Sequence, residues 1–297
     1  MKEKILGVIY GTAIGDALGW PVEFDKSVYP SKPKVFPDSV PAQYTADTQM
    51  FRAVVEGLLR NNETIDGSAQ EVAEEFIAWS KSPENNRAPG RSCMSGCYYL
   101  ELGRDWRKCG SPNSKGCGSA MRSMAYGIFQ RDAKMAATWA AEHTLMTHGH
   151  RGAQASAAAV AAGVAAGING ERKGNVMMHM LEAADHWDDY TNTLLCEAAQ
   201  SFHADADTIL DKWRGWTGDE AVAASLWCFL RHPTDFESAV LTAVNSPGDS
   251  DSLGAITGAL MGAHVGVSGI PERWIKQVED SVGLEVLASR VCKRLGL

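Results

Sequence analysis

The sequence predicts an all-α fold, and three features of its 297 residues support this prediction. Apolar residues recur at helical spacing from the start, as at Ile5, Ile9 and Ala13, and the alternation typical of strands is scarce. No linker-like tract divides the chain and no solenoid repeat is found, so we expect one domain over residues 1–297. Proline and glycine residues that break helices predict loops near residues 30–41, 83–90, 110–118, 215–218, 247–248 and 269–271, and therefore about a dozen helices.

The predicted helices follow one another along the chain with few gaps. The first ends near Gly19 and the second begins near Gln49. Helical spacing then continues through Val54, Leu58 and Leu59, through Val72, Phe76 and Trp79, and through Leu194, Ala198 and Phe202. Three alanine-rich segments, 133–141, 153–166 and 255–263, combine high helix propensity with little bulk. We expect them at the centre of a compact bundle, where helices approach closely.

Composition and charge exclude several classes of function. A hydrophobic content of 45% and a charged content of 22% are ordinary for a globular protein. The net charge of −8 and the lack of a basic run argue against a nucleic-acid partner, which would need clustered lysine and arginine. The apolar segments 153–168 and 255–267 are too rich in alanine and glycine, and too short, to cross a bilayer. We therefore expect neither nucleic acid nor membrane as a partner.

The first ten residues and the cysteines both indicate a cytoplasmic protein. Lysine and glutamate interrupt the short apolar run of residues 1–10, which lacks the features of a secretion signal. The seven cysteines are an odd number without a C-x-x-C pair, which favours reduced thiols. Cys93 and Cys97 lie one helical turn apart, but a structural zinc site needs a second pair. We interpret them as buried apolar residues.

Several polar segments are candidates for chemistry, and each has a purely structural alternative. Asp16 lies inside the first helix, where we expect a hydrogen-bonding or capping role. Glu23 follows that helix and is either a solvated acid or a functional one. In the segment 44–50, Thr45 and Asp47 are equally explained as an N-terminal cap.

The segment 246–255 contains two acids, Asp249 and Asp251, followed by Ser252 and a helix of small residues. A helix cap needs only one acid. Several carboxylate and hydroxyl oxygens within four residues suit a divalent cation such as Mg²⁺ or Mn²⁺. Metal binding and capping both remain open at this point.

Two further segments are weaker candidates. In the segment 113–122, Gly116 and Gly118 let backbone N–H groups approach a ligand, and a helix N-terminus favours phosphate. The spacing of a Walker loop is absent. The segment 143–150 contains three histidines without the neighbouring ligands that zinc requires, so we expect one or more of the rings at the surface and accept at most His148 as a donor to a ligand.

Taken in order, these segments resemble the ADP-ribosylglycohydrolase family over residues 7–266. The most specific matches are G-D-A-L-G followed by glutamate, T-x-D-T, C-G-S-A-M-R, and G-D-S-D-S followed by G-A-I-T-G-A-L-M-G-A. The resemblance implies an all-α fold with two Mg²⁺ or Mn²⁺ ions at its centre. It also implies hydrolysis of the bond between ADP-ribose and an acceptor, by water that the ions activate.

The resemblance also implies a role for particular residues. Glu23 is expected in acid–base chemistry or gating, with Asp47, Asp249 and Asp251 completing the catalytic group. The implied metal ligands are Thr45, Asp47, Asp249, Asp251 and Ser252, where Ser252 stands at the family's usual threonine. The implied contacts to ADP-ribose, besides Glu23, are Gly90, Ser92, Ser114, Lys115, Gly116, Cys117, Gly118, Met121 and His148.

The segments 86–94 and 117–124 look most like the arginine-specific branch, so an ADP-ribosylated arginine protein is the expected partner. One position departs from the family pattern: the usual Thr-Asp-Asp-Thr reads Thr45-Ala46-Asp47-Thr48. Ala46 therefore indicates an impaired or substrate-trapping form. The alternatives are an ADP-ribose-binding protein that neutralises an ADP-ribosylating toxin with little hydrolysis, or a purely structural protein on the same fold.

Overall fold

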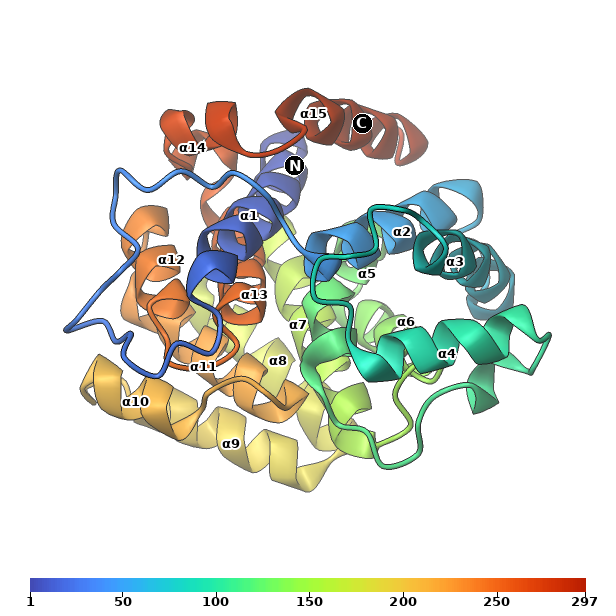
Figure 1. The fold of residues 1–297 in the computed structure, drawn as a ribbon, viewed down its shortest axis with the longest axis horizontal. Helices are drawn as coiled ribbons and strands as arrows, with labels where there is room; N and C mark the ends of the chain where they lie inside the picture. Colours follow the sequence, from blue (N-terminus) through green and yellow to red (C-terminus); the bar gives the residue numbers. More distant parts are fainter.

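The protein is built from α-helices, as the sequence predicts, and Figure 1 shows them packed around a central group. A computed structural model describes all 297 residues. It contains no strand, only three isolated β-bridges. The α-helices are α1 (Lys2–Gly19), α2 (Ala46–Arg60), α3 (Ile65–Ser80), α4 (Arg91–Glu101), α5 (Met124–Phe129), α6 (Ala133–Thr144), α7 (Arg151–Ile168), α8 (Lys173–Trp187), α9 (Asp189–Gln200), α10 (Ala206–Lys212), α11 (Gly218–Arg231), α12 (Phe236–Val244), α13 (Ser250–Val265), α14 (Glu272–Gln277) and α15 (Ser281–Arg294). Four short 3-10 helices complete the fold: η1 (Trp20–Val22), η2 (Trp106–Lys108), η3 (Cys117–Arg122) and η4 (Val267–Gly269).

Helices α1 and α13 pack backbone to backbone through glycines spaced four residues apart. On α1 these are Gly7, Gly11, Gly15 and Gly19, and they meet Gly262, Gly258, Gly254 and Ser250 on α13. A Cβ added to Gly11 would lie 2.1 Å from the carbonyl oxygen of Gly258. Only glycine permits this approach. The pairing runs antiparallel and places the end of α1 beside the start of α13, where the candidate acids lie.

Two of the three alanine-rich segments, 153–166 and 255–263, form central helices, whereas the segment 133–141 lies in α6, which exposes Lys134 and Met135. Every residue of α7 from Gly152 to Ile168 is buried, and so is every residue of α13 from Ser250 to Ala263. By length and composition, the segment Lys2–Val22 could cross a membrane, but 83% of its apolar window is buried inside the fold. All seven cysteines are free thiols, and Cys93 and Cys97 are buried, as expected.

Two predicted helix boundaries are wrong. Helix α2 begins at Ala46 rather than near Gln49, because the Thr45 side chain accepts a hydrogen bond from the Asp47 N–H and caps the helix earlier. Helix α9 ends at Gln200, so Phe202 lies beyond it and is 37% exposed. The structure has more helices than the predicted dozen, and several of the fifteen, such as α5 and α14, are short.

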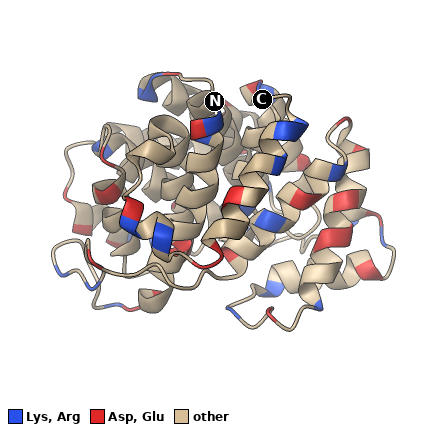
Figure 2. Cartoon of the chain, turned by 90° about the horizontal axis from the view of Figure 1, so that it is seen from above, with Lys and Arg blue, Asp and Glu red and all other residues tan.

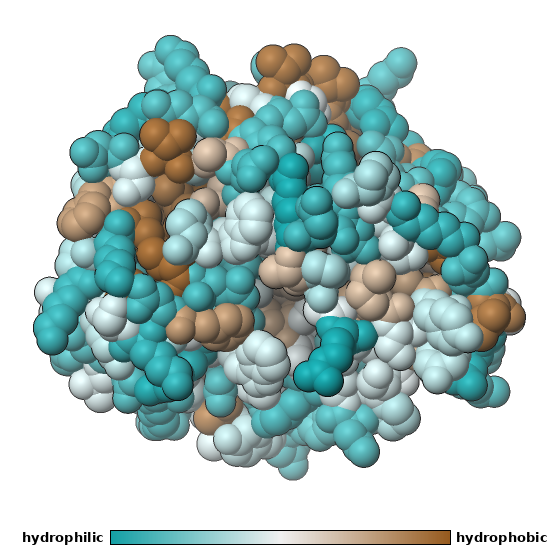
Figure 3. All heavy atoms as spheres, in the orientation of Figure 1, coloured by the Kyte–Doolittle hydropathy of each residue, from teal (hydrophilic) through white to brown (hydrophobic).

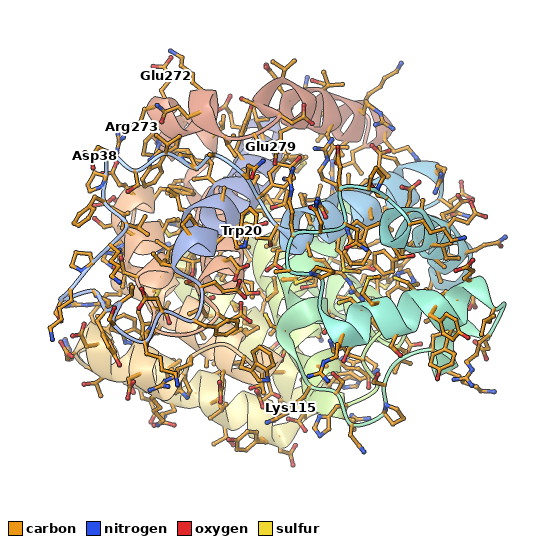
Figure 4. The ribbon with its side chains drawn as sticks, in the orientation of Figure 1. Trp20, Asp38, Lys115, Glu272, Arg273 and Glu279 are labelled. Atoms are coloured by element: carbon orange, nitrogen blue, oxygen red, sulfur yellow. The ribbon has the colours of Figure 1, made fainter.

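A strap of mostly irregular structure, residues 23–45, connects α1 to α2 and passes around α12 and α14 (Figure 1). The buried Asn245 side chain holds it by accepting from the Lys34 and Val35 N–H groups, at 2.9 and 3.0 Å. Arg273 Nε donates to the Pro37 carbonyl oxygen, close to the Asp38 labelled in Figure 4. The strap therefore has a fixed course between the two helix ends that carry Glu23 and Thr45.

The surface carries both signs of charge and few apolar patches. Lysine and arginine alternate with aspartate and glutamate over the helices visible in Figure 2. The face in Figure 3 is largely hydrophilic, with an apolar patch at the upper edge, where Figure 1 places α15. Val282 and Val286 on α15 are 75% and 53% exposed.

Candidate functional site

The end of α1 and the starts of α2 and α13 meet at the floor of a cleft of about 980 Å³. Carboxylates gather there. One ligand oxygen each from Glu23, Asp249 and Asp251 lie within 4.8 Å of one another. Asp47 and Ser252 line the same cleft. Residues more than 200 positions apart thus form one acidic group, as the resemblance implies.

The start of α13 uses little of its acidic side chains for capping. Asp249 occupies the N-cap position but its side chain makes no capping hydrogen bond. Its backbone is held by its own N–H, which donates to the Arg214 carbonyl oxygen at 2.7 Å. Asp251 accepts from the Ser252 N–H at 2.9 Å. The two carboxylates therefore retain acceptor capacity that faces the cleft.

The start of α2 supplies a hydroxyl and a carboxylate to the same group. Thr45 Oγ1 caps the helix and also donates to Asp251 Oδ2 at 3.4 Å. Asp47 Oδ2 accepts from Ser252 Oγ at 2.7 Å. Thr45 is buried behind the acids and does not line the cleft, unlike the other expected metal ligands. Thr45 therefore caps α2 and also contacts the acidic group.

Asp16 has the hydrogen-bonding role that the sequence suggests for it. Its carboxylate is fully buried and accepts from the Thr45 N–H, the Thr48 N–H and the Thr48 hydroxyl at 3.0, 2.9 and 2.6 Å. Burial raises the pKa of Asp16 to about 7, and the nearby Asp251 carboxylate adds to the rise. Because its oxygens are occupied by α2, Asp16 orients the second helix rather than facing the cleft.

The electrostatics of the acidic group fit a bound cation. Burial raises the pKa values of Asp47, Asp249 and Asp251, and repulsion from Asp251 adds to the rise at the other two. No lysine or arginine forms an ion pair with any of the group. Buried carboxylates without a counter-charge are costly. Carboxylate and hydroxyl oxygens are also the donors that Mg²⁺ and Mn²⁺ prefer.

Glu23 projects into the cleft from the turn that follows η1. Burial raises its pKa to about 8, with further contributions from Asp251 and Asp16. Its place is set by the next residue, because the Phe24 N–H donates to the Gly248 carbonyl oxygen at 2.7 Å. Phe24 adopts φ +57°, a left-handed conformation that is uncommon for a bulky residue. Glu23 can therefore carry a proton near neutral pH at a fixed place beside the other acids.

The glycine-containing loop before η3 forms one wall of the cleft, and the first turn of α4 forms part of another. The Ser92 and Ser114 hydroxyls, one from each wall, lie 2.7 Å apart. Gly90 is the N-cap of α4 and has no side chain to satisfy the first-turn N–H groups. The expected ligand contacts that line this cleft are Gly90, Ser92, Ser114, Lys115, Gly116, Cys117, Gly118, Met121 and His148.

The loop is fastened to its neighbours on two sides. Isolated bridges join Ser111 to His148 and Gly116 to Thr217. Lys115, labelled in Figure 4, pairs with the buried Asp219 at 2.9 Å. The loop therefore has a fixed shape, and its glycines leave room in the cleft.

Of the three histidine rings in residues 143–150, only His150 is even partly exposed, so the expected surface ring can only be that one. His143 and His148 are 1% and 2% exposed. Burial lowers the pKa of His143 to about 4 and that of His148 to about 3. Their burial arises from distant segments, because His148 lies against Gly116 and Gly118, and His143 bonds to Tyr126 and to the Ile65 carbonyl oxygen. The third ring, His150, is half-buried and caps α7 by accepting from the Gly152 N–H at 2.9 Å.

The structure adds cleft residues that sequence patterns do not single out. Trp216 is 65% exposed and lines the mouth of the cleft. It packs edge-on against Phe24, with the ring centroids 5.3 Å apart. Arg91, at the start of α4, also lines the cleft. Ala46, by contrast, is 1% exposed, belongs to the hydrophobic core and does not line the cleft.

The sequence and the fold of the chain are both similar to those of known proteins. The model of the family described as ADP-ribosylglycohydrolase matches residues 1–296. The ADP-ribosyl-[dinitrogen reductase] glycohydrolase of Rhodospirillum rubrum is 26% identical over 96% of this chain and 94% of its own. The ADP-ribosylarginine hydrolase Tri1 of Pseudomonas putida (strain GB-1) is 25% identical over 98% of this chain and 78% of its own. A solved structure, described as an ADP-ribosylglycohydrolase-related protein complex, has a TM-score of 0.81 at 23% identity, covering 99% of this chain and 98% of that one. The chain therefore belongs to the ADP-ribosylglycohydrolase family.

Proposed function

We propose that the protein hydrolyses the bond between C1″ of the distal ribose of ADP-ribose and an acceptor, favouring arginine in a protein. The observation that carries this proposal is the acidic group of Glu23, Asp249 and Asp251 at the floor of a cleft that is walled by the glycine-containing loop. A cleft of about 980 Å³ has room for a dinucleotide-sized ligand. Its charged floor and glycine-containing wall suit a sugar at one end and a diphosphate beyond it.

Two Mg²⁺ or Mn²⁺ ions would be held by Asp47, Asp249 and Asp251, with the Thr45 and Ser252 hydroxyls completing the donor set. Such ions, when bound, polarise sugar hydroxyls and lower the pKa of bound water. The protein's own contribution is to fix these oxygens on three helix ends that glycine packing and Asp16 hold in place. Ser252 keeps the hydroxyl of the family's usual threonine.

We assign proton transfer to Glu23. A guanidine leaving group needs a proton as the C–N bond breaks, and a carboxylic acid with a raised pKa can supply it. Burial raises the pKa of Glu23 to about 8, which favours the protonated form of this acid. Its position beside Asp249 and Asp251 supports a role at the end of the cleft where we propose that the sugar binds.

The preference for arginine is supported by the mouth of the cleft. Phe24, the residue after Glu23, and Trp216 present aromatic rings there, packed edge-on against each other. A guanidinium group stacks well on aromatic faces because it is planar and weakly hydrated. The name of the Pseudomonas putida relative also refers to arginine. Faster release of ADP-ribose from an arginine-linked peptide than from a serine-linked peptide would support this preference. Equal or reversed rates would contradict it.

A second candidate function is binding of ADP-ribose with little hydrolysis, as in a protein that neutralises an ADP-ribosylating toxin. Ala46 favours it, because the family pattern has an acid there, whereas the buried Ala46 side chain brings no oxygen to the cleft. Loss of one anionic oxygen weakens a two-ion site most at the second ion, since the cations repel each other. Calorimetry with ADP-ribose, set beside a turnover assay at saturating Mg²⁺, separates the two candidates. Tight binding without release of ADP-ribose would favour the second.

A further inference from the structure

Arg122, on η3 beneath the glycine-containing loop, is a buried arginine without an acidic partner. It is 2% exposed and belongs to no ion pair. Its guanidinium group donates to the Gly118 carbonyl oxygen at 2.9 Å and to Thr147 Oγ1 at 2.7 Å. It also lies over the Phe76 ring, 4.6 Å from the centroid. Burying a charge without an ion-pair partner costs free energy of folding. We therefore expect a role of Arg122 in the neighbouring cleft.

The hydrogen bond from Arg122 determines in which direction the Thr147 hydroxyl forms its second hydrogen bond. Thr147 is completely buried, and Oγ1 accepts from Arg122 because a guanidinium can only donate. The other partner of Oγ1 is Nδ1 of His148, at 2.8 Å. No other acceptor lies within reach of the hydroxyl hydrogen, so the hydroxyl donates to Nδ1. His148 is then neutral with its hydrogen on Nε2.

The hydrogen bond of the His148 ring to the protein is made at Nδ1, and Nε2 faces the glycines of the loop. A Cβ added to Gly118 would lie 3.3 Å from Nε2, and one added to Gly116 would lie 3.6 Å from it. The absence of side chains at these two positions opens the nitrogen to the cleft, which His148 lines. The backbone is also fixed, because the Gly149 N–H donates to the Ser111 carbonyl oxygen at 2.9 Å.

We infer that Arg122 and Thr147 are positioning residues, which lock His148 as the Nε2–H tautomer so that it donates a hydrogen bond to a phosphate oxygen of the bound ligand. The identity of that acceptor rests on the proposed function; the tautomer lock does not. An Nε2–H donor above a buried positive charge suits an anionic oxygen, whereas the opposite tautomer would turn a lone pair towards it.

His143 provides an internal control, because its tautomer is fixed by different groups. Its Nε2 lies 3.0 Å from the Ile65 carbonyl oxygen, which only accepts, so Nε2 carries the hydrogen. The Tyr126 hydroxyl therefore donates to Nδ1, at 3.0 Å. A substitution at Thr147 that changes only the hydrogen bonds from Arg122 through Thr147 to His148 leaves the His143 tautomer unchanged. General loosening of the fold changes the tautomers of both rings.

The test combines nuclear magnetic resonance of ¹⁵N-labelled histidine rings with ADP-ribose binding by calorimetry. Thr147→Val keeps the shape of the side chain and removes the hydroxyl. Thr147→Ser keeps the hydroxyl and removes the methyl group that packs near Gly96. We expect the parent and Thr147→Ser to show His148 as Nε2–H, and Thr147→Val to show a mixture or the opposite tautomer. All three should keep His143 as Nε2–H.

In the binding arm, we expect Thr147→Val to bind ADP-ribose about tenfold more weakly, the loss typical of one hydrogen bond, with adenosine as the phosphate-free control. Thr147→Ser should bind like the parent. An Nδ1–H ring in the parent, or an unchanged Nε2–H ring in Thr147→Val, would overturn the tautomer lock. A weakening that is equal for adenosine would overturn the phosphate contact. If the parent did not bind ADP-ribose at all, the proposed function would fail, and the ring spectra would still decide the lock.

Discussion

Gly15 of α1 and Gly254 of α13 touch through their backbones, so that a Cβ added to Gly15 would lie 2.0 Å from the Gly254 carbonyl oxygen. This contact lies one turn before the end of α1 and one turn after the start of α13. It therefore sets the distance between the segments that carry Glu23 and those that carry Asp249 and Asp251. The geometry of the acidic site thus depends on the packing of these small residues.

Gly15→Ala should destabilise the protein by about 1–3 kcal/mol, because the two backbones cannot move apart without opening the core. Urea unfolding measures this free energy. The matched control is Gly174→Ala on α8, where an added Cβ meets nothing within 4 Å and alanine is the better helix former. Equal stability of Gly15→Ala and the parent would show that the contact can relax.

Mg²⁺ should stabilise the folded protein, since only the folded chain brings the acids together. At a concentration 100 times the dissociation constant the gain is about 2.7 kcal/mol, or roughly 5 °C in Tm. Asp249→Asn should lose this gain, and without metal it should be at least as stable as the parent because one repelling charge is gone. Thermal unfolding with and without Mg²⁺ measures both effects. A full Mg²⁺ response in Asp249→Asn would remove Asp249 from the site.

Lowering the pH should destabilise the folded protein, because the buried His143 ring resists protonation. Burial lowers its pKa to about 4, against about 6.5 for an unfolded chain. The unfolded chain therefore binds a proton before the folded one does, and stability falls as the pH falls from about 6.5 to 4. The difference corresponds to roughly 3 kcal/mol.

Urea unfolding at pH 7 and pH 4.5 measures the contribution of His143. His143→Gln should show a smaller loss of stability between the two pH values than the parent. His203→Gln is the matched control, because His203 is exposed in the folded protein. An identical loss in the parent and in His143→Gln would exclude His143 as the source.

Glu23→Gln should reduce turnover by about 10²- to 10⁴-fold, the range for removal of a general acid. The amide keeps the shape of the side chain but carries no transferable proton, so ADP-ribose affinity should change little. The comparison is best made in both the parent and the Ala46→Asp form, so that slow turnover in the parent does not hide the effect. A loss of only a few-fold would refute the role of Glu23 in proton transfer.

Much of the fold could be predicted from sequence because helical spacing and breakers are local signals. The same applies to the acids at 249 and 251, since two carboxylates exceed what a helix cap needs. Features that depend on tertiary packing were missed. The start of α2 at Ala46 depends on the Thr45 cap and also on Asp16, thirty residues away, which accepts from the Thr45 and Thr48 N–H groups. Burial of His143 and His148 and the place of Trp216 at the cleft mouth likewise arise from segments distant in sequence.

Metal-dependent release of ADP-ribose from an ADP-ribosylated arginine protein is the most direct measurement, made with the parent and with Ala46→Asp. We predict slow release by the parent and release faster by orders of magnitude in Ala46→Asp, because a restored transition-state contact is worth about tenfold per 1.4 kcal/mol. Both rates should disappear when Mg²⁺ and Mn²⁺ are removed. Equal rates for the two forms would show that position 46 is not a ligand position. No metal-dependent release by either form would contradict the assignment of hydrolysis to this cleft.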